Sequence, residues 1–207
     1  MAPASNFEHG SVIVFDMGGV LYDFQGARLI ARTSRRARRW RSDEVRALWP
    51  ELSRGFETGT ATESEFAEAV VQRYDLTLTS DEFLAEFRTA AVGFYDGALS
   101  LVTALRERHR VLSLSNTNPV QWGKVMADLG ASDPFHAHHP SHVIGFHKPD
   151  LRAFEAASRQ IAAGTTCYFF DDRTENVNAA LRFGWRAQRV RGVAEARAAC
   201  QQAGLLV

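Results

Sequence analysis

The chain has 207 residues, of which 45% are hydrophobic and 23% are charged, a composition typical of a globular protein rather than a disordered or fibrous one. Its 24 basic residues balance 24 acidic residues, so no net positive charge favours binding to nucleic acid or to a membrane surface. The first apolar run, Val12–Phe15, is too short for a secretory signal or a membrane span. The two cysteines, Cys167 and Cys200, cannot form a disulfide framework, and together these features predict a cytoplasmic protein.

Short apolar runs predict the buried strands of a parallel sheet at Val12–Phe15, Val111–Leu114, Tyr168–Phe170 and, more weakly, Ala187–Val190. Helix-start residues follow two of these runs: Pro119 is placed to open a helix, and Thr174 or a nearby acid is placed to cap a helix that ends at Gly184. This alternation predicts an α/β fold with a doubly wound, Rossmann-like parallel sheet. Ligands of such sheets bind beyond the carboxyl ends of the strands.

The segment between the first two of these strands, roughly 70 residues long, has helix signals and no strand-like run. Thr62 with Glu65, and Thr79 with Glu82, have the spacing of helix-capping boxes. We therefore expect a core domain made of residues 1–24 and 93–207, and an inserted helical cap domain made of residues 25–92.

An arginine-rich stretch lies in this insert. Two interpretations are a polyanion-binding surface and an exposed helix face in a chain whose lysines are only Lys124 and Lys148. The balanced net charge favours the exposed face, and we expect no nucleic-acid partner, although one or two of these side chains could face a substrate. The arginines of the stretch are Arg28, Arg32, Arg35, Arg36, Arg38, Arg39, Arg41 and Arg46.

Acidic residues stand where two of the predicted strands end. Asp16 directly follows the first strand, and Asp171 and Asp172 directly follow the third; Ser115 and Asn116 directly follow the second. Because the carboxyl ends of parallel strands meet at one edge of a sheet, these residues should gather in one cleft. Three carboxylates in a small cleft repel one another by several kcal/mol unless a cation lies among them, and hard oxygen ligands favour Mg²⁺.

Lys148 precedes Pro149, which is a good first residue for a helix predicted over 149–160. A lysine there can bring a positive charge to an anion above the sheet. Neighbouring histidines lack the spacing of a zinc site, so we expect structural or solvent-exposed roles for them, with His147 the nearest to a substrate. These histidines are His136, His138, His139, His142 and His147.

Four motifs of the chain resemble those of the haloacid dehalogenase-like (HAD) hydrolase superfamily, in the same order. They are FDMGGVL at 15–21, LSNTN at 114–118, HKPD at 147–150 and FFDDRTENVNAA at 169–180. The resemblance covers almost the whole chain, and the insert has the size and place of the family's small helical cap. The text FETGTATESEF in the insert is similar to the branch that contains bacterial α-D-glucose-1-phosphate phosphatases and the phosphatase-like domain of epoxide hydrolases.

The resemblance implies a role for each of these residues. Asp16 would be the nucleophile that forms an aspartyl-phosphate, which water then hydrolyses. Lys148 would neutralise the charge shared by nucleophile and phosphate, and Ser115, Asn116 and Gly19 would contact phosphoryl oxygens. The cap would close over the substrate. The implied Mg²⁺ ligands are Asp16, the backbone carbonyl of Gly18, Asp171 and Asp172.

Gly18 departs from the pattern of most phosphatases in this superfamily, which carry an aspartate there as the general acid and base. General acid–base help is typically worth about 10²–10⁴-fold, so its loss would slow the reaction without abolishing metal binding. A substrate with a good leaving group, such as an anomeric phosphate, would be affected least, and the branch that this chain resembles also carries glycine there.

These features leave three functions open. The leading one is a Mg²⁺-dependent phosphatase of a small phosphorylated metabolite, with a sugar phosphate as the first candidate. The second is a non-catalytic module that binds a phospholigand. The third is a haloacid dehalogenase, against which Gly18 and the intact acid pair both count. The substrate and the choice between monomer and homodimer stay open.

Overall fold

The computed structural model describes residues 10–36 and 42–206. At its centre is a parallel sheet of five strands in the order β5-β4-β1-β6-β7. Its middle strand, β1, pairs with β4 and β6, so that Val14 lies opposite Leu112 on one side and Phe169 on the other. The predicted α/β fold class is therefore confirmed. The strands are β1 (Val12–Phe15), β4 (Arg110–Ser115), β5 (Ala137–Pro140), β6 (Cys167–Asp171) and β7 (Arg186–Arg189).

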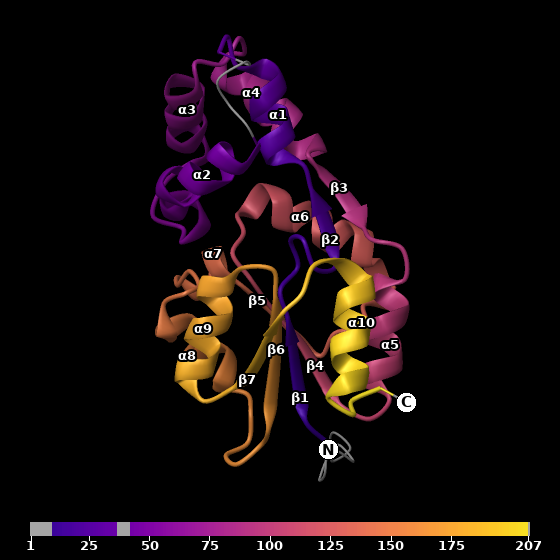
Figure 1. The fold of residues 1–207 in the computed structure, drawn as a ribbon. Coiled ribbons are helices and arrows are strands. Elements are labelled where there is room, and N and C mark those ends of the chain that lie inside the picture. The colour runs from indigo at the N-terminus through magenta and orange to yellow at the C-terminus, as the bar shows by residue number, and fades with distance from the viewer. Residues whose placement is uncertain (1–9, 37–41, 207) are drawn as a thin grey trace.

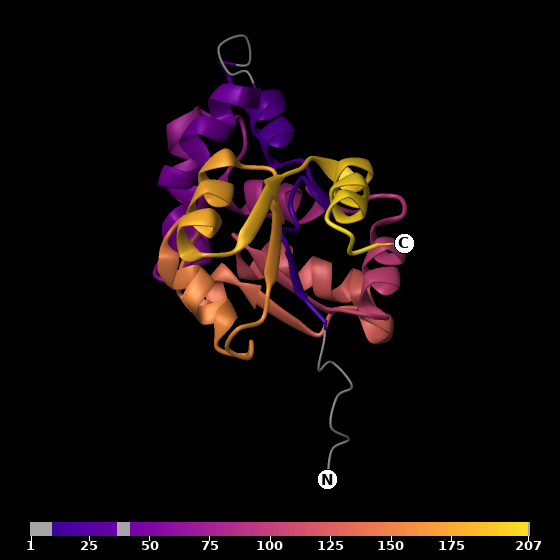
Figure 2. The same cartoon turned by 60° about the horizontal axis from the view of Figure 1, so that its bottom comes forward.

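Helices cover both faces of the sheet because successive side chains of a strand point to opposite faces. Ile13 and Phe15 belong to the apolar cluster that the sheet shares with α5, α6 and α10. Val12 and Val14 belong to the cluster shared with α8 and α9. Figures 1 and 2 show α10 on one side of the strands and α8 and α9 on the other. These helices are α5 (Ala98–Arg106), α6 (Pro119–Leu129), α8 (Leu151–Ser158), α9 (Thr174–Phe183) and α10 (Gly192–Gln202).

A helical insert, defined here as helices α1 to α4, lies beyond the carboxyl ends of the strands (Figure 1). It has an apolar cluster of its own, in which the rings of Phe83 and Phe87 stack and that of Phe66 lies tilted against both. A two-stranded antiparallel ribbon, β2 (Tyr22–Phe24) with β3 (Ala91–Phe94), joins the insert to the sheet. The four helices are α1 (Gly26–Thr33), α2 (Ser42–Glu57), α3 (Glu63–Tyr74) and α4 (Ser80–Thr89).

Most of the helix boundaries predicted from capping residues, proline and glycine agree with the structure. Both predicted capping boxes are present at the starts of α3 and α4, and α6 begins at Pro119. Gly184 follows the end of α9 in a left-handed conformation. The expected cap at Thr174 is wrong, because Thr174 is the first residue inside α9 and the N-cap position is Arg173, whose side chain makes no capping hydrogen bond.

The start of α8 also differs from the expectation. Pro149 lies outside the helix, which begins at Leu151, because the side chain of Asp150 accepts the N–H of Arg152 and occupies the N-cap position. The remaining short helices are η1 (Gly130–Ser132) and α7 (Ser141–Ile144).

Three strands were not predicted from the sequence. β2 and β3 form only the short ribbon that leads to the insert, and β5, with the sequence AHHP, is an edge strand of the sheet. In β5 the His138 side chain combines polar and apolar contacts: its two ring nitrogens contact Ser113 and Asp133, and its ring lies against Trp122 and Phe135. An edge position also tolerates Pro140, whose nitrogen cannot donate to a ladder.

The described arginines of the arginine-rich stretch are exposed. Arg32 pairs with Glu86, and Arg35 and Arg36 both pair with Asp75, which agrees with a solvated helix face. Arg38, Arg39 and Arg41 lie outside the described residues, as does the side chain of Arg46. No helix in the described parts of the chain has both the length and the apolar character needed to cross a membrane.

Candidate active site

Three acidic side chains meet at the carboxyl edge of the sheet. Asp16 follows β1 directly, Asp171 ends β6, and Asp172 is the next residue. One carboxylate oxygen from each lies within 4.8 Å of the others. They are brought together because β1 and β6 are adjacent parallel strands, and the N–H of Asp16 donates to the carbonyl of Phe170 at 2.9 Å. The expected juxtaposition of these acids is therefore present.

Lys148 places its ammonium group inside this cluster. The side chain is only 1% exposed, and its Nζ lies 2.9 Å from Asp16 Oδ1, 2.7 Å from Asp171 Oδ2 and 2.6 Å from the carbonyl of Leu114. An ammonium has three hydrogens to donate, so these three acceptors engage all of them. The cluster consequently has one buried cation for three carboxylates and keeps an excess of negative charge.

This imbalance changes the proton affinities of the site. Burial raises the pKa of the Asp16 carboxyl to about 7; Lys148 opposes this shift, and the charges of Asp171 and Asp172 add to it. Burial lowers the pKa of Lys148, but Asp16 and Asp171 outweigh it, so the pKa ends above its ordinary value. The lysine therefore stays charged, whereas a further cation beside Asp16 would lower the pKa of its carboxyl and favour the ionised form at neutral pH.

Asp171 and Asp172 differ in their surroundings. Asp171 is fully buried, and its two oxygens accept hydrogen bonds from Lys148, from the side-chain amide of Asn176 and from the N–H of Arg173. Asp172 is half-buried and lines the pocket described below. Asn176 Oδ1 is buried and has no hydrogen-bond partner among the described residues. A buried acceptor without a donor is costly, so this amide oxygen is suited to a cation or a water molecule.

The turn after Asp16 is built around two glycines. Gly19 has a φ of +77°, and a Cβ atom there would lie 2.8 Å from Asp172 Oδ2. At Gly18 a Cβ atom would lie 3.1 Å from the ring of Phe24, so an aspartate at this position would require the ring to move. The N–H of Gly19 donates to the carbonyl of Tyr22 at 3.0 Å, and so it is already engaged rather than open to a phosphate oxygen.

The two polar residues at the end of β4 have different positions. Ser115 is buried and ends the strand, but it is not among the residues that line the pocket. Asn116 does line the pocket. Its side chain makes two hydrogen bonds with the backbone of Lys148, accepting the N–H at 2.8 Å and donating to the carbonyl at 2.9 Å. The motif text did not indicate this contact, since the two residues are 32 positions apart.

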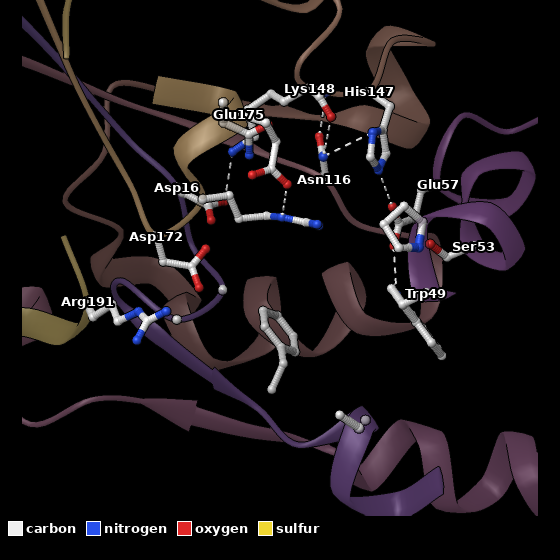
Figure 3. Close-up of a pocket in the computed structure, with 18 of the residues that line it drawn as sticks. Asp16, Trp49, Ser53, Glu57, Asn116, His147, Lys148, Asp172, Glu175 and Arg191 are labelled. Carbon is white, nitrogen blue, oxygen red and sulfur yellow. Dashed lines mark hydrogen bonds and ion pairs between the residues drawn. The ribbon is translucent and has the colours of Figure 1, made fainter. Parts of the chain in front are cut away.

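A pocket of about 480 Å³ opens beside the acids, a size suited to a small metabolite. The core contributes Asp16, Lys148 and Asp172 to its wall, and the helical insert contributes Trp49 and Glu57 from α2. Figure 3 shows the two sets on opposite sides of the pocket. Sequence reasoning did not find Trp49 or Glu57, because neither belongs to a motif that is close in sequence to the acids.

The histidines upstream of Lys148 are mostly held by the core. His136 accepts the N–H of Val111, His139 contacts the carbonyl of Ser113, and His142 contacts the carbonyl of Thr117. The candidate metal-binding group found among the described residues consists of the three aspartates and includes no histidine. His147 is the one of these histidines that lines the pocket.

A family model for haloacid dehalogenase-like hydrolases matches residues 11–184. The chain belongs to this family. Among characterised relatives of this HAD-like hydrolase, Phosphatase MT3486 of Mycobacterium tuberculosis is 29% identical over 189 residues, which cover 87% of each chain.

Two solved structures illustrate the similarity of fold. A HAD family enzyme, bt-2542 of Bacteroides thetaiotaomicron, solved with magnesium and inorganic phosphate, has a TM-score of 0.68 and 21% identity, covering 88% of this chain and 94% of its own. The L-2-haloacid dehalogenase of Xanthobacter autotrophicus has a TM-score of 0.60 and 20% identity, covering 87% and 77%. Since a dehalogenase is also among the similar folds, the fold by itself does not select the reaction.

Proposed function

We propose that this HAD-like hydrolase is a Mg²⁺-dependent phosphatase of a small phosphorylated metabolite, with a sugar phosphate as the first candidate. The observation that carries the proposal is the buried Asp16 carboxylate, held by Lys148 beside two further carboxylates and facing a pocket of metabolite size. The similarity to a phosphatase supports it, as does the magnesium and phosphate complex of a protein with the same fold.

The residues at the site fit a magnesium ion. The cluster offers only hard oxygen ligands, carries excess negative charge and adjoins the unpartnered amide oxygen of Asn176. Asp16, the carbonyl of Gly18, Asp171 and Asp172 would hold the ion; Asp16, Gly18 and Asp172 line the pocket, whereas Asp171 is buried and already accepts several hydrogen bonds. When bound, magnesium supplies positive charge that offsets the repulsion between the Asp16 carboxylate and a phosphate dianion.

Each residue then has a defined task in hydrolysis. An Asp16 oxygen attacks phosphorus as the bond from phosphorus to the leaving-group oxygen breaks, giving an aspartyl-phosphate; the leaving oxygen takes a proton from water. Water then attacks the same phosphorus, which releases inorganic phosphate and restores the carboxylate. Lys148 fixes Oδ1 of the nucleophile and offsets negative charge throughout. Ser115, Asn116 and Gly19 stay predicted phosphate contacts; for Gly19 this would require its N–H to leave the carbonyl of Tyr22.

The helical insert is proposed to act as the cap. It supplies one wall of the pocket, and a wall from a separate helical unit can exclude bulk water from the reacting phosphorus. The cytoplasmic location also stays a proposal; it is supported by the two cysteines, both of which are free and buried.

A non-catalytic phospholigand-binding module is the second candidate, favoured by one observation. Position 18 holds glycine, and the ring of Phe24 lies close to where a side chain would project, so no acid is offered to the leaving group from that position. Such a module would bind inorganic phosphate in the presence of Mg²⁺ but would release none from an ester.

A panel assay separates these functions. We expect Mg²⁺-dependent release of inorganic phosphate from anomeric and other sugar phosphates and from p-nitrophenyl phosphate, with loss of release in EDTA. Binding of phosphate without turnover would support the binding module instead. Release of halide from 2-haloacids in the presence of EDTA would support the dehalogenase and contradict the proposal.

Asp172→Ala should sharply raise the Mg²⁺ concentration needed for half-maximal activity, because Asp172 is the pocket-facing member of the acid pair. Loss of a residue that only supports a metal ligand typically costs about 10–100-fold in metal affinity, so loss of a carboxylate ligand itself should cost at least about tenfold. Titration of Mg²⁺ against the rate of phosphate release measures the effect, and Asp96→Ala, at an exposed acid outside the pocket, is the matched control. An unchanged magnesium requirement in Asp172→Ala would contradict the ligand assignment.

A further inference from the structure

The helical insert meets the core through a buried contact between Glu57 and His147. Glu57 Oε2 lies 2.8 Å from His147 Nε2, although the two residues are 90 positions apart. Their exposed fractions are only 4% and 9%. Trp49 lies about two turns earlier on α2. Its indole N–H donates to the other carboxylate oxygen of Glu57, Oε1, at 3.3 Å. Figure 3 shows this contact at the end of the pocket away from Asp172.

The hydrogen-bond pattern fixes which ring nitrogen of His147 carries the hydrogen. Two hydrogen bonds identify the oxygen and the nitrogen of the Asn116 amide, since the N–H of Lys148 donates to Oδ1 and the carbonyl of Lys148 accepts from Nδ2. The same Nδ2 lies 3.1 Å from His147 Nδ1, which must therefore be the acceptor. His147 Nε2 then carries the hydrogen and donates it to Glu57.

These bonds form one continuous chain from the insert to the nucleophile. It runs from Glu57 through the ring of His147 to the amide of Asn116, and from there to the backbone of Lys148. The ammonium of the same lysine contacts Asp16 at 2.9 Å. Hydrogen bonds between successive residues therefore link the helical insert to Lys148, the residue that holds the nucleophile Asp16.

Local stability does not account for Glu57. It is the last residue of α2, where the negative end of the helix dipole disfavours a carboxylate. It is also buried, and burying a charge against His147 and the indole N–H of Trp49 gains little or nothing for folding compared with an apolar residue of similar volume. We therefore look for the role of the Glu57 carboxylate in the active site.

We propose that Glu57 and His147 are positioning residues: when the insert is docked, they orient Asn116 and so align Lys148 with Asp16. This inference rests on the proposed phosphatase function of the site. It predicts that catalysis depends on an acceptor oxygen at position 57 rather than on its negative charge. Misalignment of a catalytic group by about 1 Å can reduce a rate by about 100-fold, so a loss of the acceptor should be measurable.

Two substitutions of similar volume test this dependence. Glu57→Gln keeps an acceptor oxygen for His147, and we expect kcat for p-nitrophenyl phosphate within about threefold of wild type. Glu57→Met removes the acceptor without leaving a buried charge, so it should fold, and we expect kcat to fall by about 10–100-fold. Glu51→Gln, on the exposed side of α2, is the matched control and should match wild type. Rates are normalised to the folded fraction measured by circular dichroism at the assay temperature.

A purely structural role for the contact would give a different result. It would lower the melting temperature while leaving kcat per folded molecule unchanged in Glu57→Met, and that outcome overturns the proposal. Because the residues act through one chain, Glu57→Met combined with His147→Phe should be no slower than the slower single variant. Fully multiplicative rate losses would also overturn it.

Two further measurements do not depend on turnover: the tautomer of the His147 ring and the affinity for inorganic phosphate. In wild type, ¹⁵N NMR should show an unprotonated Nδ1 and a protonated Nε2, and the reverse tautomer would contradict the chain. If wild type hydrolyses no ester, the proposed phosphatase function fails. The positioning inference then survives only if Glu57→Met weakens the Mg²⁺-dependent binding of inorganic phosphate by about tenfold while Glu57→Gln does not.

Discussion

Lys148→Met should destabilise the metal-free protein by about 3–5 kcal/mol and reduce phosphate release by at least about 100-fold. The lysine is 1% exposed and is the cation that contacts both Asp16 and Asp171, so its removal leaves two buried carboxylates without compensation. Methionine keeps most of the side-chain volume, which separates the loss of charge from the creation of a cavity. Urea unfolding in EDTA measures the first effect, and the phosphate-release assay measures the second.

Magnesium should recover part of the lost stability but not the lost rate. A bound cation offsets the repulsion among the three carboxylates, yet it does not replace the hydrogen bond that fixes Asp16 Oδ1. The chain offers a well-matched control because Lys124 is its only other lysine. Lys124 forms an exposed pair with Asp128 one helical turn away, and Lys124→Met should change stability by less than about 1 kcal/mol. Similar effects of the two substitutions would contradict the role given to Lys148.

Asp16→Asn should abolish phosphate release, with a loss of at least about 10⁴-fold, because an amide cannot form the aspartyl-phosphate. The same substitution should stabilise the metal-free protein at neutral pH, since it removes one of three like charges that lie close together, two of them buried. Activity should fall while stability rises, so a loss of activity caused by misfolding would be recognised by a fall in stability. Asp96→Asn is the control for a carboxylate outside the pocket.

The pH dependence of that stabilisation follows from the raised pKa. Asp16 has a pKa of about 7 in the folded protein and an ordinary value of 3.8, so between these pH values the folded state binds more protons than the unfolded state. Wild-type stability in EDTA therefore loses a contribution as the pH rises from about 4 to 7, and the loss is complete above 7. Urea midpoints at pH 5 and pH 8 should show a stability difference between wild type and Asp16→Asn that grows with pH, on the order of a few kcal/mol. A difference that is independent of pH would contradict the shift.

Much of the candidate site can be predicted from the sequence because its acidic residues lie at the ends of strands. Asp16 and Asp171 stand beside short apolar runs that predict buried strands, and parallel pairing of two adjacent strands brings their carboxyl ends together. The capping boxes of the insert were equally local, since each needs only a threonine and a glutamate three residues apart. Short-range patterns of this kind are readable without knowing the fold.

The amino-acid sequence by itself therefore determined the α/β class, the main strands and the gathering of acids at one edge of the sheet. Only the tertiary structure decided that Asp171 is enclosed while Asp172 faces the pocket, and that Glu57 reaches His147 across 90 positions. It also decided that β5 is a strand, because its His138 is held by hydrogen bonds to Ser113 and Asp133 that no local apolar pattern announces. The physical reason is common to all three: burial and hydrogen-bond partners are properties of chain segments brought together from a distance, and no local period or spacing encodes them.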